Sequence, residues 1–165
     1  MGQRMINLRS KNVLTDYGKG DLNFITDIED NYCIKLPNTY IEFILAHNGA
    51  TLVNDIFDYD DPNYKDERNA DALAFMKVEN IQHNIETVKS GEEPDWPIEY
   101  RFEEGLIPFG DNGGGDMICF DYRNDKTTDN PPIVIWNHDM GLKHRVVFIA
   151  NNFEEFINML HESED

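Results

Sequence analysis

The segment from Ile107 to Tyr122, IPFGDNGGGDMICFDY, constrains the fold more than any other part of the chain. A short apolar run ends at Gly110, three consecutive glycines follow, and an alternating apolar segment begins at Met117. Glycine adopts positive φ readily and allows other chain atoms to approach closely. The pattern therefore predicts two strands joined by a special turn, with at least one of the three glycines at positive φ.

The polar residues of this segment are predicted to cap the turn. Asp111 and Asn112 can accept hydrogen bonds from backbone amides close to them in the chain. A phosphate-binding loop is disfavoured, because Asp116 and Met117 stand where Gly-Lys-Ser/Thr would be required. A dinucleotide-binding fingerprint would need a helix next, whereas a strand pattern follows. We therefore predict a structural turn formed by Asp111, Gly113, Gly114, Gly115 and Asp116.

Helical patterns occur at both ends of the chain. Asp21 is a predicted N-cap, and Pro37 suits the first turn of a second helix. Asn152 begins a closing helix, with Glu155 placed as in a capping box. The apolar face of this closing helix is formed by Phe153, Phe156 and Leu160.

The middle of the chain has strand patterns and one further helix, over 80–89. Strands are predicted over 50–53, 56–57, 72–78, 106–109, 117–122, 133–137 and 145–150. This order predicts an α+β fold with a mixed, mainly antiparallel sheet, on which the N-terminal helix pair and the C-terminal helix pack. We expect a single domain over residues 1–165 with its core at about 20–160. The aromatic residues Tyr40, Phe109, Phe120, Trp136 and Phe148 are predicted to lie in this core.

The formal net charge of the chain is −18 over 165 residues, and it is unevenly distributed. Residues 1–50 carry −1, residues 51–105 carry −10 and residues 106–165 carry −7. Nucleic-acid binding usually needs a basic patch, and an anionic membrane repels an acidic chain, so neither partner is expected. The acidic surface either serves solubility alone or steers a basic protein toward the chain.

The two cysteines, Cys33 and Cys119, lie in apolar contexts and are predicted to be small core residues. They form no metal-binding pair and no disulfide framework, which fits a reducing cytoplasm. The first residues of the sequence lack the long apolar stretch of a secretory signal. A membrane span is not expected, because no apolar run of about 18 residues occurs.

Patterns that would indicate chemistry are weak. A weak calcium site at Asp58, Asp60 and Asp61, or a zinc site at His138, Asp139 and His144, would lack a specific ligand spacing. No serine occupies a G-x-S-x-G motif, and the contexts of the cysteines argue against a stabilised thiolate. We therefore predict no catalytic residue, metal or cofactor. A carboxylate-based hydrolase remains an alternative, because the 32 acidic residues offer many carboxylate pairs.

Four segments together resemble the SUKH superfamily, the Smi/Knr-type domains found widely as bacterial toxin-immunity proteins. They are LPNTYIEFILAHNGA from Leu36, IPFGDNGGGDMICFDY from Ile107, PPIVIWNHD from Pro131 and ANNFEEFINML from Ala150. They occur in the family's order over roughly residues 20–160. The resemblance implies an α+β fold and, in many members, a small cytoplasmic protein that neutralises a cognate toxin, often a nuclease. The family also includes fungal regulators of cell-wall signalling, and it implies no common catalytic residue.

The resemblance and the charge lead to one functional hypothesis, an immunity protein that binds a basic toxin domain. A nuclease is the expected toxin, because it must hold a polyanion and an acidic protein can compete for that basic surface. Two acidic segments, 58–71 and 92–104, are the expected contact regions, and Trp96 is included as an aromatic anchor. The predicted contacts are Asp58, Asp60, Asp61, Asp66, Glu67, Glu92, Glu93, Asp95 and Trp96. An intracellular scaffold or regulator with another partner is the main alternative.

Overall fold

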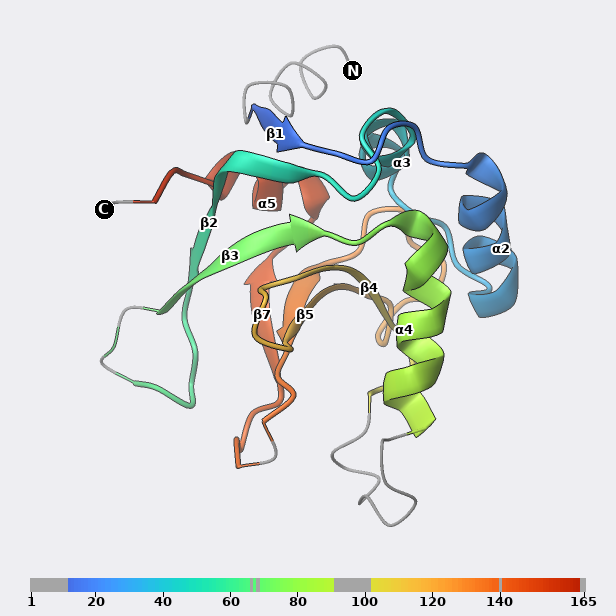
Figure 1. The fold of residues 1–165 in the computed structure, drawn as a ribbon. Helices are drawn as coiled ribbons and strands as arrows, with labels where there is room; N and C mark the ends of the chain where they lie inside the picture. Colours follow the sequence, from blue (N-terminus) through green and yellow to red (C-terminus); the bar gives the residue numbers. More distant parts are fainter. Residues whose placement is uncertain (1–11, 66, 68, 91–101, 140, 164–165) are drawn as a thin grey trace.

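The sheet of the computed structural model has seven strands, and each pairs with the next one along the chain (Figure 1). Residues 12–65, 67, 69–90, 102–139 and 141–163 are described. The strands are β1 (Val13–Thr15), β2 (Thr51–Tyr59), β3 (Asn69–Phe75), β4 (Leu106–Asp111), β5 (Met117–Asp121), β6 (Ile133–Trp136) and β7 (Val146–Ala150). All six pairings between these described strands are antiparallel, so the parallel component of the predicted mixed sheet does not occur among them.

Four helices accompany the described part of the sheet: α2 (Leu22–Tyr32), α3 (Asn38–Ala46), α4 (Val78–Ser90) and α5 (Phe153–Met159). The predicted caps are confirmed. The Asp21 carboxylate accepts a hydrogen bond from the Asn23 amide, and the Asn152 side chain accepts one from the Glu155 amide. These oxygens satisfy amides that have no partner within the helix.

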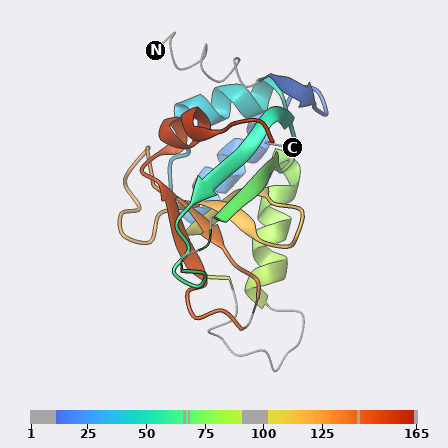
Figure 2. The same ribbon diagram turned by 90° about the vertical axis from the view of Figure 1, so that its left-hand side faces the viewer.

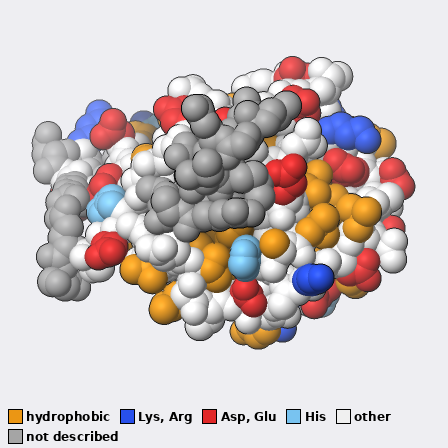
Figure 3. Space-filling view, turned by 90° about the horizontal axis from the view of Figure 1, so that it is seen from above, with side chains coloured by type: hydrophobic (Ala, Val, Ile, Leu, Met, Phe, Trp, Pro, Cys, Tyr) orange, Lys and Arg blue, Asp and Glu red, His pale blue; other side chains and the backbone are white. Residues whose placement is uncertain are grey.

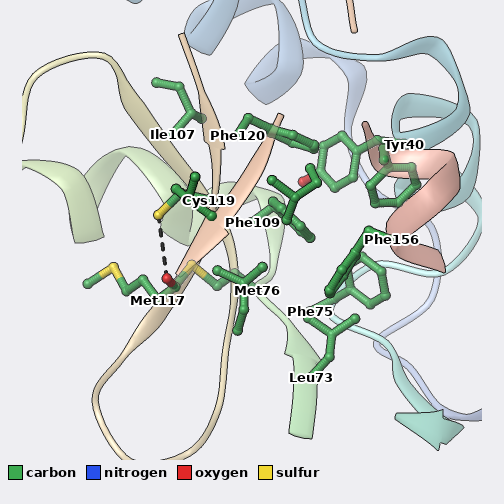
Figure 4. Close-up of a cluster of buried hydrophobic side chains, with 14 of the residues drawn as sticks. Tyr40, Leu73, Phe75, Met76, Ile107, Phe109, Met117, Cys119, Phe120 and Phe156 are labelled. Atoms are coloured by element: carbon green, nitrogen blue, oxygen red, sulfur yellow. Dashed lines mark hydrogen bonds between the residues drawn. The ribbon is translucent and has the colours of Figure 1, made fainter. Parts of the chain in front are cut away.

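Aromatic side chains join α3 and α5 to the sheet. The Tyr40 ring of α3 meets Phe120 at 5.1 Å and Phe153 at 5.7 Å between ring centroids, in edge-to-face contacts. Phe109 stacks on Phe120, and Phe156 of α5 lies against Phe109 (Figure 4). Both Phe153 and Phe156 are fully buried, which confirms that the closing helix packs on the sheet. Edge-to-face and offset-stacked contacts of this kind stabilise a core beyond the area that they bury.

The opposite face of the central strands is also covered. Side chains alternate between the two faces of a strand, so Met117 and Cys119 point away from the Tyr40 cluster (Figure 4). Both are buried, and α4 contacts β4 on this part of the sheet. Strands β5 and β6 are consequently buried along their whole length, which explains their nearly continuous apolar sequences.

Several predictions about single residues are wrong. Cys33 is exposed and ends α2 in the left-handed conformation, at φ 55°, instead of lying in the core. Phe148 is 54% exposed on β7, because this position of the last strand is not covered by a helix. The predicted strands 50–53 and 56–57 are parts of one strand, β2, which begins at Thr51, and Val78 begins α4 instead of ending β3.

Candidate partner-binding surface

The glycine turn joins β4 to β5, as predicted. Gly113 and Gly115 have φ of +80° and +103°, a region that side-chain-bearing residues rarely adopt. The Asp111 carboxylate accepts a hydrogen bond from the Gly113 amide at 3.0 Å. The side-chain oxygen of Asn112 accepts hydrogen bonds from the amides of Gly114 and Asp116. The polar residues of the turn therefore hold its own backbone, which is a structural role.

The turn is also tied to the segment that follows β6. The Asp116 carboxylate lies 2.6 Å from Nδ1 of His138 and accepts a hydrogen bond from the His138 amide at 3.0 Å. A Cβ atom on Gly115 would lie 3.0 Å from the His138 ring. Gly115 thus provides both the positive φ and the space that the histidine needs.

A polar network continues from this turn to the β2–β3 hairpin. The Asn112 side-chain amide donates to Asp116 at 3.1 Å and to Asp71 at 3.2 Å. Asp71 in turn accepts a hydrogen bond of 2.6 Å from the Tyr59 hydroxyl. Burial and this hydrogen bond raise the pKa of Tyr59 well above its usual range, so the hydroxyl remains a donor at neutral pH. Three segments distant in the sequence are held together in this way.

The loop between β2 and β3 is anchored by Asn63. Its side-chain amide donates to the His144 carbonyl at 2.7 Å, and its side-chain oxygen accepts from the His144 amide at 2.9 Å. Asp61 is buried beneath the loop and accepts hydrogen bonds from both the backbone and the side-chain amide of Asn63. The loop is therefore docked onto the segment that leads into β7.

A groove of about 580 Å³ lies between this loop and β7. The two walls are the end of β2 with its following loop and the strand β7, which lie side by side in two views (Figure 1 and Figure 2). The first wall contributes the carboxylates of Asp58, Asp60 and Glu67. The second contributes Val146 to Ile149, including the exposed ring of Phe148.

The structure brings some of the predicted contact residues to this groove and gives them different roles. Asp60 and Glu67 are exposed, whereas Asp58 belongs to β2 and lies 2.7 Å from Nε2 of His161. Asp61 is only 5% exposed and holds the loop from within. The predicted acidic loop 58–71 is therefore a hairpin, whose first and last residues are in strands. Asp66, Glu92, Glu93, Asp95 and Trp96 lie outside the described residues.

Acidic side chains are widely spread over the described surface. They are scattered across the face shown in Figure 3, with hydrophobic side chains exposed between them. Arg123, one of the basic residues, is held by Asp121 at 2.9 Å and by Glu103 at 2.7 Å, and these hydrogen bonds raise its pKa above its ordinary value. With 32 acidic residues against 14 lysines and arginines, most carboxylates of the chain have no basic residue to neutralise them.

The described residues give little support for chemistry. No group of three or more His, Cys, Asp or Glu side chains among them has an arrangement that could hold a metal ion. The Cys119 thiol is fully buried, and this burial raises its pKa well above the ordinary value, which disfavours a reactive thiolate.

Sequence reasoning did not find three residues that shape this surface: Asn63, His138 as a partner of Asp116, and the exposed Phe148. An asparagine in a polar loop has no special sequence signal, because its partner is 81 positions away. Phe148 belongs to an apolar strand pattern, and the pattern does not reveal that this strand is the last in the sheet.

Residues 20–159 match the model of the SMI1 / KNR4 family (SUKH-1). The match spans most of the chain, and the chain belongs to this family. A comparison with curated proteins finds no match. Within the part of the chain that the structure describes, no helix combines the length and the apolar character that crossing a membrane requires.

Proposed function

We propose that this protein is an immunity protein that binds a cognate toxin and neutralises it by direct protein–protein contact. The observation that carries the proposal is the family match over residues 20–159. The superfamily is widely represented among bacterial toxin-immunity proteins, which act by occupying a partner and not by catalysis. A cytoplasmic location fits this role, because the toxin must be neutralised where its target lies.

The charge of the chain supports a basic toxin domain, and a nuclease in particular. A nuclease holds a polyanionic substrate and therefore presents a basic surface. A chain with a net charge of −18 attracts such a surface over long range and competes with the substrate for it. Steric blocking and electrostatic competition then act together.

The anchored loop beside β7 supports the same proposal. Two hydrogen bonds between Asn63 and His144 tie the loop that carries the exposed Asp60 and Glu67 to the segment leading into β7. A surface that is already ordered before binding loses less conformational entropy when its partner docks. The observed anchoring thus favours a binding surface over a purely solubilising loop.

Protection of cells provides the test. The coding sequence next to the gene of this chain is expressed from an inducible promoter, with and without the chain, and survival is measured. A pull-down of the two purified products follows. Survival that requires the chain, together with a stable complex, supports the proposal. A harmless neighbouring product that does not bind would contradict it and favour a scaffold or regulator with another partner.

A further inference from the structure

We propose that the groove beside β7 receives a basic extended segment of the partner, which adds to the sheet as a further strand. This inference rests on the proposed function and specifies how the partner docks. Strand β7 is the last in the sheet and pairs with β6 along one edge. Among the described strands none pairs with its other edge, and that edge lines the groove.

The strand register identifies which backbone groups face the groove. The Asn137 amide donates to the Arg145 carbonyl at 2.7 Å, so these two residues form a hydrogen-bonded pair. Hydrogen-bonded and non-bonded pairs alternate along an antiparallel ladder. Val146 and Phe148, opposite Trp136 and Val134, therefore direct their backbone amides and carbonyls away from β6. An added strand can pair with these groups.

The walls of the groove select the chemistry of the added strand. Asp58, Asp60 and Glu67 line it, and none of the described lining residues is basic. Side chains of an extended segment alternate between two faces, so lysines or arginines at alternate positions can reach the carboxylates. Apolar residues between them can cover the exposed Phe148 ring. The groove volume of about 580 Å³ falls within the usual range for binding pockets.

A second copy of this chain is a poorer occupant than a basic segment. Pairing of two β7 edges would bring together two sets of these carboxylates on chains that each carry a net charge of −18. Like charges opposed across an interface are unfavourable. The charge therefore favours a basic partner over self-association at this edge.

A synthetic peptide tests the inference on the full chain. The probe is a ten-residue peptide of alternating lysine and valine, and the matched control has glutamate in place of lysine. Binding is followed by fluorescence anisotropy, and amide hydrogen exchange is followed residue by residue. We expect the lysine peptide alone to bind and to slow exchange at Val146 and Phe148, whereas the amide of Val147 already pairs with β6.

Two sets of variants separate charge from strand addition. Asp60→Lys with Glu67→Lys should weaken peptide binding by at least about tenfold. Asp27→Lys with Asp30→Lys, the same charge change on exposed positions of the distant helix α2, should have a much smaller effect (Figure 1). Phe148→Pro removes an amide that faces the groove, without removing a bond to β6, and should weaken binding more than Phe148→Ala.

The outcomes distinguish this inference from the proposed function. Three results would overturn the groove assignment. The two peptides could bind equally well, or proline and alanine at Phe148 could have equal effects. The chain could also self-associate and protect the β7 amides without any peptide. The chain could still protect cells through another face in that case. A different result would overturn the toxin as the occupant of the groove. In that result the peptide binds as expected, but the chain neither protects cells nor forms a complex with the neighbouring product.

Discussion

The side chain of Asn63 is hydrogen-bonded to both the amide and the carbonyl of His144, at 2.9 Å and 2.7 Å. This pair of contacts joins the β2–β3 loop to the entrance of β7 across 81 positions of sequence. It ties the acidic loop, which lines one side of the groove, to the segment that leads into β7 on the other side. The two residues are in contact in the structure, but the sequence pattern does not indicate this contact.

Removing this contact should loosen the loop. Asn63→Ala deletes two side-chain hydrogen bonds to His144 and also removes the hydrogen bond from the Asn63 side-chain amide to Asp61. We expect the free energy of unfolding to fall by about 1–3 kcal/mol, because the buried Asp61 carboxylate loses a partner. Urea denaturation measures this change. Asn130→Ala, at an exposed loop position, is the control and should stay within about 0.5 kcal/mol of the parent. Similar losses for the two variants would contradict the anchoring role.

The glycine turn offers a matched pair of substitutions. Gly115→Ala places a Cβ atom 3.0 Å from the His138 ring at a φ of +103°, whereas the nearest atom to a Cβ on Gly114 is at 3.5 Å. Strain at such a backbone position costs about 1–3 kcal/mol. We expect Gly115→Ala to lower the thermal midpoint and Gly114→Ala to leave it nearly unchanged. A larger effect at Gly114 would show that the turn has another conformation in solution.

Alkaline pH should lower the free energy of unfolding through the titration of tyrosine hydroxyl groups. Burial, together with the hydrogen bond to Glu86, raises the pKa of Tyr32 from 10.0 to about 12. Between these values the unfolded chain releases the phenolic proton while the folded chain keeps it. The folded state then binds more protons, so the free energy of unfolding falls as pH rises through this window.

Urea unfolding at several values between about pH 9 and about pH 11, roughly one unit either side of the ordinary tyrosine pKa, measures this dependence. Tyr32→Phe removes the titrating group and should make the stability of the chain less sensitive to pH. An identical slope in the parent and in Tyr32→Phe would contradict the contribution of this residue.

The local parts of the fold could be predicted from the sequence. The glycine turn and the caps at Asp21 and Asn152 depend on contacts between residues that are neighbours in the chain, and all three are confirmed. The burial of Phe153 and Phe156 followed from helical spacing, because one face of an amphipathic helix must be covered.

The non-local parts could not be predicted in the same way. Burial of Phe148 depends on whether another element covers β7, and its strand pattern is the same in either case. Cys33 follows an apolar helix pattern, yet it adopts the left-handed conformation that ends α2 and is exposed there. Asp61 looked like its acidic neighbours in the sequence, although it is buried and hydrogen-bonded to Asn63.

This difference changes how the electrostatic role of the loop should be tested. Neutralising Asp61 together with its neighbours would disturb the hydrogen bonds that Asp61 accepts from Asn63. A loss of stability would then be confounded with a loss of binding. The exposed pair Asp60 and Glu67 avoids this problem. Substituting this pair changes the charge of the surface while leaving the anchoring contacts in place.

The association rate with the product of the neighbouring coding sequence, measured by stopped flow over a range of salt concentrations, tests the central claim most directly. A rate that is fast at low salt and falls by about tenfold or more as salt rises is the predicted result, because screening weakens steering between opposite charges. Asp60→Lys with Glu67→Lys should slow association at low salt more than Asp27→Lys with Asp30→Lys. A rate that does not depend on salt, or an equal effect of the two double variants, would contradict an acidic docking surface beside β7.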